Sequence, residues 1–160
     1  MKGIILSQGR VAIVDDDDYD RISAIGKWSF AQGYARRVKH SIDENGKKIS
    51  KSIHMSHLVA GAKDGDFVDH INGNSLDNRK CNLRICSKAQ NNCNVNKKST
   101  KFGNFKGVFW NKKGEFWYVR IGVNKKSKYI GIFNDEIEAA RAYNEAAIKY
   151  HGEFAKLNEL

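Results

Sequence analysis

The sequence lacks any apolar run that approaches the roughly 20 residues of a membrane-spanning helix. Its first eight residues contain neither a long apolar segment nor a cleavage site of the kind that signal peptides carry. These two absences argue against a membrane protein and against a secreted one. We therefore expect the protein to stay in a reducing compartment, the cytoplasm.

Cysteine is also scarce, with Cys81, Cys86 and Cys93 as the three examples in the chain. An odd number of cysteines without a Cys-x-x-Cys pair fits neither a disulfide framework nor the paired ligands of a structural zinc. We expect free thiols, buried as small apolar side chains, and no structural zinc.

The composition favours a globular protein with an acidic partner. The chain has 160 residues, enough for one ordinary domain or two small ones, and 41% of them are hydrophobic, which argues against a disordered chain. The net charge is +10 and the pI is near 9.5. A charge of this size favours a polyanion such as nucleic acid. The alternative is a basic protein whose charge serves only solubility.

Residues 68–92 carry the strongest pattern in the chain. An apolar residue leads into Asp69 and His70, a turn-rich loop follows, and a short strand over residues 82–85 precedes a helix. Ser87 and Gln90 have the spacing of a capping box, which places the helix start at Ser87. Asn91 then falls on the first or second turn of that helix.

These side chains suit the cleavage of phosphodiester bonds. Asp69 and Asn91 offer the oxygen ligands that Mg²⁺ prefers, and His70 has a pKa suited to taking a proton from water. Asn82 can hydrogen-bond across the loop and hold its arms apart. Adjacent strand residues point to opposite faces, so Asp69 and His70 share a site only if the strand ends or bulges there. The alternative is a turn that is merely rich in Asn and Asp.

This stretch resembles the HNH, or ββα-metal, endonucleases of phage and intron homing enzymes. The resemblance spans roughly residues 53–94 and implies that His70 is the general base and Asn82 a structural residue. It also implies that Asp69 and Asn91 hold Mg²⁺ or Mn²⁺, with Asn91 replacing the usual final histidine. The residues that carry it are Asp69, His70, Asn72, Gly73, Asn74, Asp77, Asn78, Arg79, Asn82, Leu83, Arg84 and Asn91.

The residues before this stretch predict strands and short helices. Strands are expected at 11–14, 27–30, 34–39 and 51–53, with a hairpin turn at 43–47 and a helix at 55–61. The acidic run 15–18 is better explained as a helix start than as a metal site. His54 and His57 are expected to be structural. Arg36 and Arg37 either contact phosphates or lie on a solvated strand face.

The C-terminal segment predicts three antiparallel strands and one helix. The strands are expected at 106–110, 115–121 and 128–133, and the helix runs from residue 136 to about 150. On the middle strand, Trp117, Val119 and Ile121 should face the helix, whereas Tyr118 and Arg120 should face outward. An outer face that carries arginine, tyrosine and nearby lysines suits DNA.

The same segment resembles the APETALA-two/ethylene-response-factor DNA-binding domain of plants. That resemblance implies that Lys106, Arg120 and Tyr129, with Lys128 beside them, contact DNA. Phe109 stands where the family usually has arginine, and Tyr129 where it usually has tryptophan, so base preference does not carry over. The carrying residues are 106–108, Trp117, 129–133, 138–143, Ala146, Ala147, Gly152, Leu157 and Asn158.

Together the patterns predict an α+β protein with a ββα-metal nuclease unit with flanking strands at 1–96, a linker at 97–104 and a three-stranded DNA-binding unit at 105–160. The predicted activity is metal-dependent cleavage of double-stranded DNA by a phage-like homing endonuclease. Such an enzyme would act in the cytoplasm of the bacterial host and would cut both strands only if two chains assemble on DNA. A DNA-binding regulator without catalytic activity and an RNA-binding protein are the alternatives.

Overall fold

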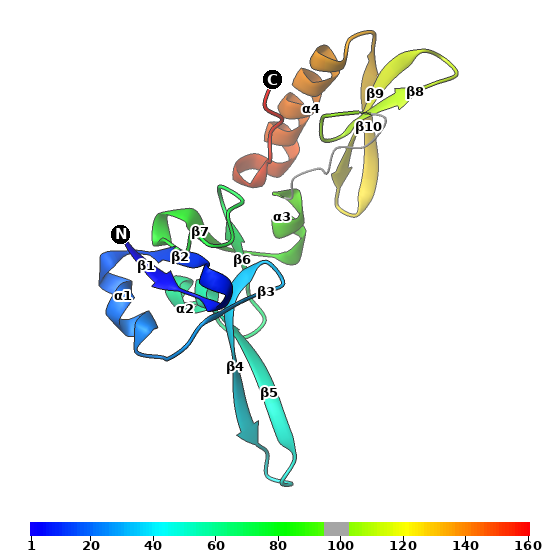
Figure 1. Ribbon diagram of the computed structural model, residues 1–160. Helices are drawn as coiled ribbons and strands as arrows, with labels where there is room; N and C mark the ends of the chain where they lie inside the picture. Colours follow the sequence, from blue (N-terminus) through cyan, green and yellow to red (C-terminus); the bar gives the residue numbers. More distant parts are fainter. Residues whose placement is uncertain (95–102) are drawn as a thin grey trace. The chain divides into compact units, whose positions relative to one another are not determined.

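The computed structural model describes residues 1–94 and 103–160, and the chain divides into two compact units, Met1–Ser87 and Lys88–Leu160 (Figure 1). The fold is α+β, as predicted. Helix α3 (Lys88–Cys93) groups with the second unit, so the division falls earlier than the predicted boundary at residue 96. Most of the predicted linker, residues 97–102, lies outside the described residues.

The first unit contains small antiparallel sheets and two short helices. The strands predicted around residues 11–14, 27–30, 34–39 and 51–53 and both helices are present. Strand β1 is not predicted, because Ile4 alone of its residues is buried. The elements are β1 (Lys2–Ile5), β2 (Val11–Val14), α1 (Asp16–Ser23), β3 (Ser29–Ala31), β4 (Tyr34–Ile42), β5 (Lys48–His54), α2 (Met55–Ala60), β6 (Phe67–His70) and β7 (Leu83–Cys86).

One apolar core joins these elements. Val14, Ile22 and Met55 are fully buried and come from β2, α1 and α2. Trp28 packs in the same cluster and donates its indole N–H to the carbonyl of Ile22 at 3.0 Å. The β1–β2 hairpin and α1 thus share one core with the strands that carry the Asp-His pair.

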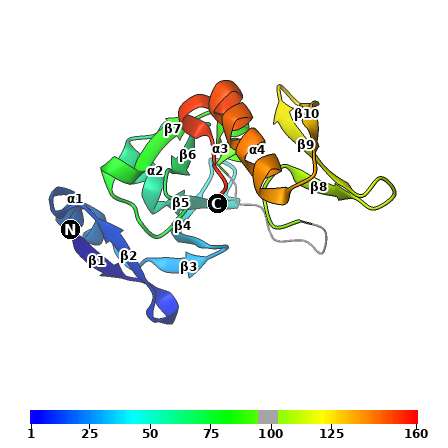
Figure 2. The same ribbon diagram turned by 90° about the horizontal axis from the view of Figure 1, so that it is seen from above.

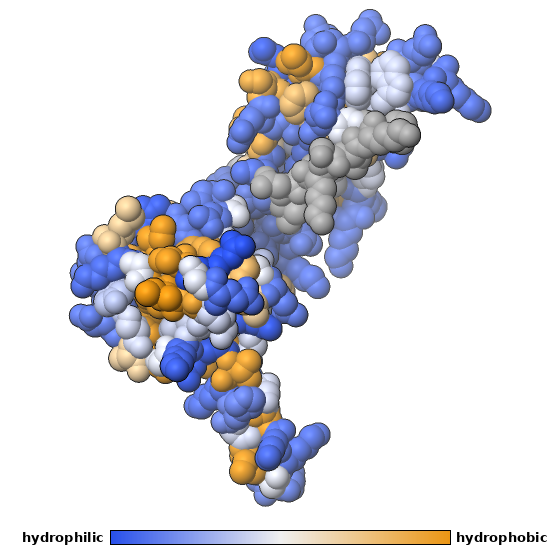
Figure 3. Space-filling view, in the orientation of Figure 1, coloured by the Kyte–Doolittle hydropathy of each residue, from blue (hydrophilic) through white to orange (hydrophobic). Residues whose placement is uncertain are grey.

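Strands β4 and β5 form a two-stranded ribbon that projects from the first unit (Figure 1). Its register runs from the Arg36–His54 pair at the base to the Ile42–Lys48 pair near the tip. Ile42 is 70% exposed, and hydrophobic and hydrophilic residues are interspersed along the ribbon (Figure 3). The side chains of the ribbon bury little surface, so the ribbon contributes little to the stability of the fold.

The second unit is the predicted three-stranded sheet packed on one helix. Strand β9 (Phe116–Val123) lies between β8 (Val108–Asn111) and β10 (Lys126–Phe133), all antiparallel, and α4 (Glu136–His151) packs on one face (Figures 1 and 2). The carboxylate of Asp135 caps α4 by accepting the N–H groups of Ile137 and Glu138, both at 2.8 Å. Among the residues described, none forms a helix long and apolar enough to cross a bilayer.

Strand β8 begins at Val108 rather than at the predicted Lys106. The reason is Gly107, whose φ of +75° lies outside the extended region and turns the chain just before the strand. The inward set on β9 is as predicted, because Val119 and Ile121 are buried against the alanines of α4.

Of the three cysteine side chains, only that of Cys86 is buried. Cys93 is half-buried and Cys81 is exposed, so the expectation that all three fill apolar space is wrong for Cys81. Cys81 lies in the 3-10 turn Lys80–Asn82, which faces solvent on that side.

Candidate active site

Strands β6 and β7 frame the site and pair antiparallel from Phe67–Cys86 to His70–Leu83. The N–H of Ile71 donates to the carbonyl of Asn82 at 2.9 Å, which extends the pairing one residue beyond His70 and Leu83. His70 is the final residue of β6, and the chain turns at once. Strand β6 therefore ends at the Asp-His pair, which is the condition for Asp69 and His70 to share a site.

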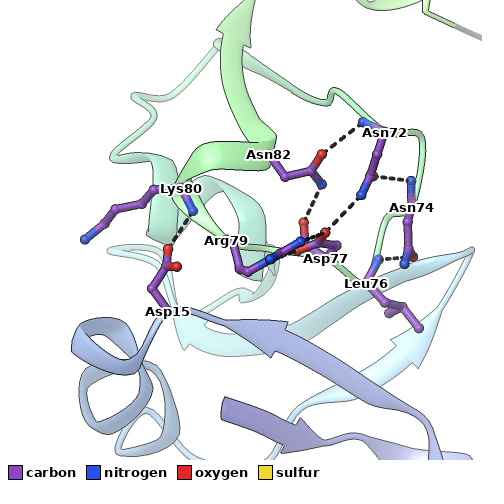
Figure 4. A network of polar contacts seen from close by, with 8 residues as sticks. All are labelled: Asp15, Asn72, Asn74, Leu76, Asp77, Arg79, Lys80 and Asn82. Atoms are coloured by element: carbon purple, nitrogen blue, oxygen red, sulfur yellow. Dashed lines mark hydrogen bonds and ion pairs between the residues drawn. The ribbon is translucent and has the colours of Figure 1, made fainter. Parts of the chain in front are cut away.

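A network of asparagine and aspartate side chains fixes the loop between the two strands (Figure 4). Asn82 Oδ1 accepts the N–H of Asn72 at 2.9 Å, and Asn82 Nδ2 donates to the carbonyl of Asp77 at 2.8 Å. Asn72 Nδ2 donates to Asp77 Oδ2 at 2.9 Å. Because Asn82 is 6% exposed and bonds both sides of the loop, it is positioned to brace it.

The brace can be tested by unfolding. Replacing Asn82 with alanine removes both of its side-chain bonds inside the loop, so we expect the free energy of unfolding of the first unit to fall by about 2 kcal/mol. Denaturant unfolding followed by the fluorescence of Trp28 measures this loss in a protein whose other two tryptophans are replaced by phenylalanine. Asn45→Ala, in the exposed turn of the ribbon, is the matched control. An equal loss of unfolding free energy in Asn82→Ala and Asn45→Ala would contradict the bracing role of Asn82.

Asp77 is held by a guanidinium as well as by the loop. Arg79 Nε and Nη2 each donate to the Asp77 carboxylate at 2.7 Å. This bidentate hydrogen bond is the main cause that holds the pKa of Asp77 below its ordinary value. Asp77 therefore stays ionised at neutral pH and contributes negative charge close to His70.

The N-terminal strand β2 and helix α1 anchor the same loop. Ile13 donates its N–H to the carbonyl of Leu76 and accepts the N–H of Asn78, both at 2.8 Å. Asp15 Oδ2 accepts the N–H of Lys80 at 2.7 Å (Figure 4), and the ammonium of Lys80 lies 2.9 Å from Asp18. The acidic run thus begins α1, as predicted, and also holds the loop.

His70 is buried and has a defined partner. It is 6% exposed, and its Nε2 lies 3.2 Å from Oδ1 of the buried Asn78. Burial is the largest influence and lowers the pKa of His70, whereas the hydrogen bond to Asn78 and the charges of Asp69 and Asp77 act in the opposite direction. The imidazole is therefore uncharged at neutral pH and can accept a proton.

The contact with Asn78 selects a tautomer of that imidazole. An amide oxygen only accepts, so Nε2 carries the proton and donates it to Asn78, and Nδ1 carries the basic lone pair. No role of Asn78 is predicted from the sequence. Its neighbours suggested a turn, and only the fold brings its side chain to His70.

Two further histidines and a tyrosine lie near His70. The ring centre of Tyr34 is 6.3 Å from that of His70 and 5.6 Å from that of His54, and His57 lies 5.5 Å beyond His54. Burial lowers the pKa of His54, with smaller effects of His57 and Arg36. His57 Nε2 donates to the carbonyl of Asp66 at 3.3 Å, in keeping with the structural role expected from sequence.

Asp69 is buried beside an arginine. Arg84 Nε and Nη2 donate to Asp69 Oδ2 at 2.8 and 2.6 Å, and the two side chains are 14% and 5% exposed. A metal ion at Asp69 would share the carboxylate with this guanidinium. No group of three or more His, Cys, Asp or Glu side chains suited to a metal occurs among the described residues. The carboxylate of Asp69 is an oxygen donor of the kind that Mg²⁺ takes while it keeps several of its waters.

The other predicted site residues lie apart from one another in the fold. Asn91 lies on α3 of the second unit, and its sharing of an ion with Asp69 stays a prediction. At the ribbon base, Arg36 donates to Gln32 Oε1 at 2.9 Å, and Arg37 donates to the carbonyl of Ile25. Arg37 is thus used to hold the ribbon to the loop after α1.

The predicted DNA contacts of the second unit do not share one face. Arg120 and Tyr129 are paired neighbours on the outer face of the sheet, as predicted. The ammonium of Lys128 lies 4.6 Å from the ring centre of Tyr150 on α4, so Lys128 is turned toward the helix. Lys106 is half-buried and donates its ammonium to the carbonyl of Cys93 at 2.5 Å.

Comparison with known proteins gives matches across both units. A family model described as HNH endonuclease matches residues 55–93. An uncharacterized HNH endonuclease of Acanthamoeba polyphaga mimivirus is 36% identical over 146 residues, which cover 86% of this chain and 73% of that protein. Protein 3.8 of Escherichia phage T7 is 27% identical over 92 residues, 58% of this chain and 75% of the phage protein.

A plant protein matches a shorter part. APETALA2-like protein 2 of Oryza sativa subsp. japonica is 46% identical over 56 residues, which are 34% of this chain and 13% of the plant protein. The chain thus spans a small part of that relative.

Proposed function

The chain belongs to the HNH endonuclease family, and from this premise we propose that it hydrolyses phosphodiester bonds of double-stranded DNA in a metal-dependent reaction. The observation that carries the proposal is the buried, uncharged His70 at the end of β6, next to the carboxylate of Asp69. A nuclease that activates water needs a base of this kind at neutral pH.

Each residue of the site has a role in this proposal. His70 accepts the proton of the attacking water at Nδ1, and Asn78 keeps the imidazole in the required tautomer. Asn82 braces the loop. Asp69 and Asn91 hold Mg²⁺ or Mn²⁺, which when bound stabilises the negative charge on the phosphate and the leaving oxygen.

Positive surfaces on both units support DNA as the substrate. We assign Arg36 and the exposed lysines of the ribbon to phosphates near the cut, and Arg120 and Tyr129 to the target that the second unit recognises. Phosphate contacts release bound cations, so affinity should fall steeply with salt. With one site per chain, the proposed product is a nick unless two chains assemble.

A DNA-binding regulator without catalysis is the second candidate, and the Asp69–Arg84 ion pair favours it because the guanidinium neutralises the predicted metal ligand.

The relatives in Escherichia phage T7 and in a mimivirus suit a viral homing endonuclease that acts in the cytoplasm of its host.

A plasmid-nicking assay tests the proposal. Supercoiled plasmid is incubated with the protein and Mg²⁺, Mn²⁺ or EDTA, and we expect an open-circular product with either metal and none with EDTA. Binding without nicking in every metal supports the regulator instead. Competition between duplex DNA and RNA for binding then tests the substrate, and preferential release by RNA contradicts DNA as the target.

A further inference from the structure

The outer face of the β8–β10 sheet carries a continuous apolar strip, formed by Phe109, Tyr118, Tyr129 and Ile132. Phe109 and Tyr118 are directly paired, with ring centres 5.4 Å apart and nearly parallel planes. Ile132 is the partner of Tyr118 on the other neighbouring strand. The exposed fractions are 39% for Phe109, 50% for Tyr129 and 56% for Ile132.

This strip is separate from the core of the unit. Strand alternation sends Val119 and Ile121 toward α4, where they are 0% and 2% exposed, and sends Tyr118 to the opposite face. The strip therefore contributes little burial to folding. Exposed aromatic and branched side chains that lie side by side on a sheet mark a surface for binding.

Charge indicates the chemistry of the partner. The segment 106–133 contains one acidic residue, Glu115, whereas the segment 134–160 contains three basic residues and six acidic ones. The sheet is thus cationic and the helix side acidic, which suits a polyanion on the outer face of the sheet. The basic residues of the sheet segment are Lys106, Lys112, Lys113, Arg120, Lys125, Lys126 and Lys128, of which Lys106 and Lys128 contact Cys93 and the ring of Tyr150 instead.

The outer face has few groups that can read bases by hydrogen bonds. Arg120 pairs with Tyr129, and its guanidinium carbon is 5.9 Å from the ring centre of Tyr118. Asn111, at the end of β8, already accepts the N–H groups of Lys113 and Gly114. In the major groove the one apolar group on a base edge is the C5-methyl of thymine.

We propose that Phe109 and Ile132 read thymine in duplex DNA by packing against its C5-methyl group. This inference rests on the proposed binding of duplex DNA by the second unit and names the base that it prefers. Arg120 supplies the polar contact beside the strip. Phe109 and Ile132 carry no hydrogen-bonding side-chain group, so the group on a base edge that they can contact favourably is the methyl group of thymine.

The test uses the full-length His70→Ala protein, so that DNA stays intact. Binding sites are selected from random-sequence duplexes, and the best site is then synthesised with thymine or with uracil, which lacks only the methyl group. Burying one methyl corresponds to about a fourfold change in affinity. We expect thymine to be enriched at fixed positions and uracil at those positions to weaken binding about fourfold each.

Matched variants assign the effect to the strip. Ile132→Ala and Phe109→Arg should each reduce the difference in affinity between the thymine and uracil duplexes, and the double variant should bind the two equally. Ile148→Ala should keep the full difference, because Ile148 is a similarly exposed isoleucine, at 57%, on α4. Tight duplex binding with no thymine enrichment, or equal binding of both duplexes by the protein with an intact strip, overturns the inference and leaves the proposed function in place. Absence of any duplex binding overturns both.

Discussion

Replacing His70 with alanine should lower the rate of plasmid nicking by about a thousandfold, the typical contribution of a general base. The variant loses the group that accepts the proton of water, whereas Asp69, Arg84 and the Asn82 brace remain. DNA affinity should stay within about twofold, because no positive charge is removed from an uncharged imidazole. Initial rates of nicking and a filter-binding titration measure the two quantities on the same protein.

His151→Ala is the control for this prediction. His151 lies at the end of α4, where it donates to the carbonyl of Gly122 at 2.8 Å, and its loss should leave the nicking rate unchanged. If His70→Ala nicks at the full rate and still requires metal, another group takes the proton. A parallel fall of nicking and of DNA affinity would assign His70 to binding instead.

Replacing Gly107 with alanine should unfold the second unit at a much lower temperature. A Cβ at this position would lie 2.1 Å from two ring carbons of Tyr143 and 2.8 Å from the carbonyl oxygen of Arg120, and the φ of +75° is one that alanine rarely adopts. Tyr143 is a buried core residue and cannot move away cheaply. Steric overlap and backbone strain together should cost about 3 kcal/mol or more.

Calorimetry on the whole chain measures this cost, with the transition of the first unit as an internal reference. Gly122→Ala is the control, because Gly122 lies on β9 with a negative φ and a Cβ there meets open space. We expect no loss of stability for Gly122→Ala. Equal melting of both variants would mean that the loop before β8 does not pack on α4 in solution.

Gly107→Ala also separates cutting from targeting. If the second unit delivers the nuclease to its site, the variant should lose high-affinity DNA binding above its lowered melting temperature. The core of the first unit is separate, so nicking of plasmid at low salt with metal present then tests whether Asn91, the proposed metal ligand on α3 of the second unit, is needed for cutting. Loss of all nicking would show that the second unit contributes to the active site itself.

Local patterns in the sequence predicted most of the elements. Alternating residues and short turns are enough for the β8–β10 meander, and α4 lies at Glu136–His151, close to the predicted 136–150. Two features of the fold were not predicted from the sequence. Strand β1 has a single buried residue, and the start of β8 depends on how Gly107 packs against Tyr143.

Within the site, the chemical groups could be predicted from the sequence, because Asp69, His70, Asn82 and the turn between them are close together in the chain. The tertiary structure alone decided their partners. Asn78 meets His70, Arg84 pairs with Asp69, and Asp15 binds the backbone of Lys80 from 65 residues away. Such contacts depend on strand register and on the packing of β2 against the loop, and no local pattern records either.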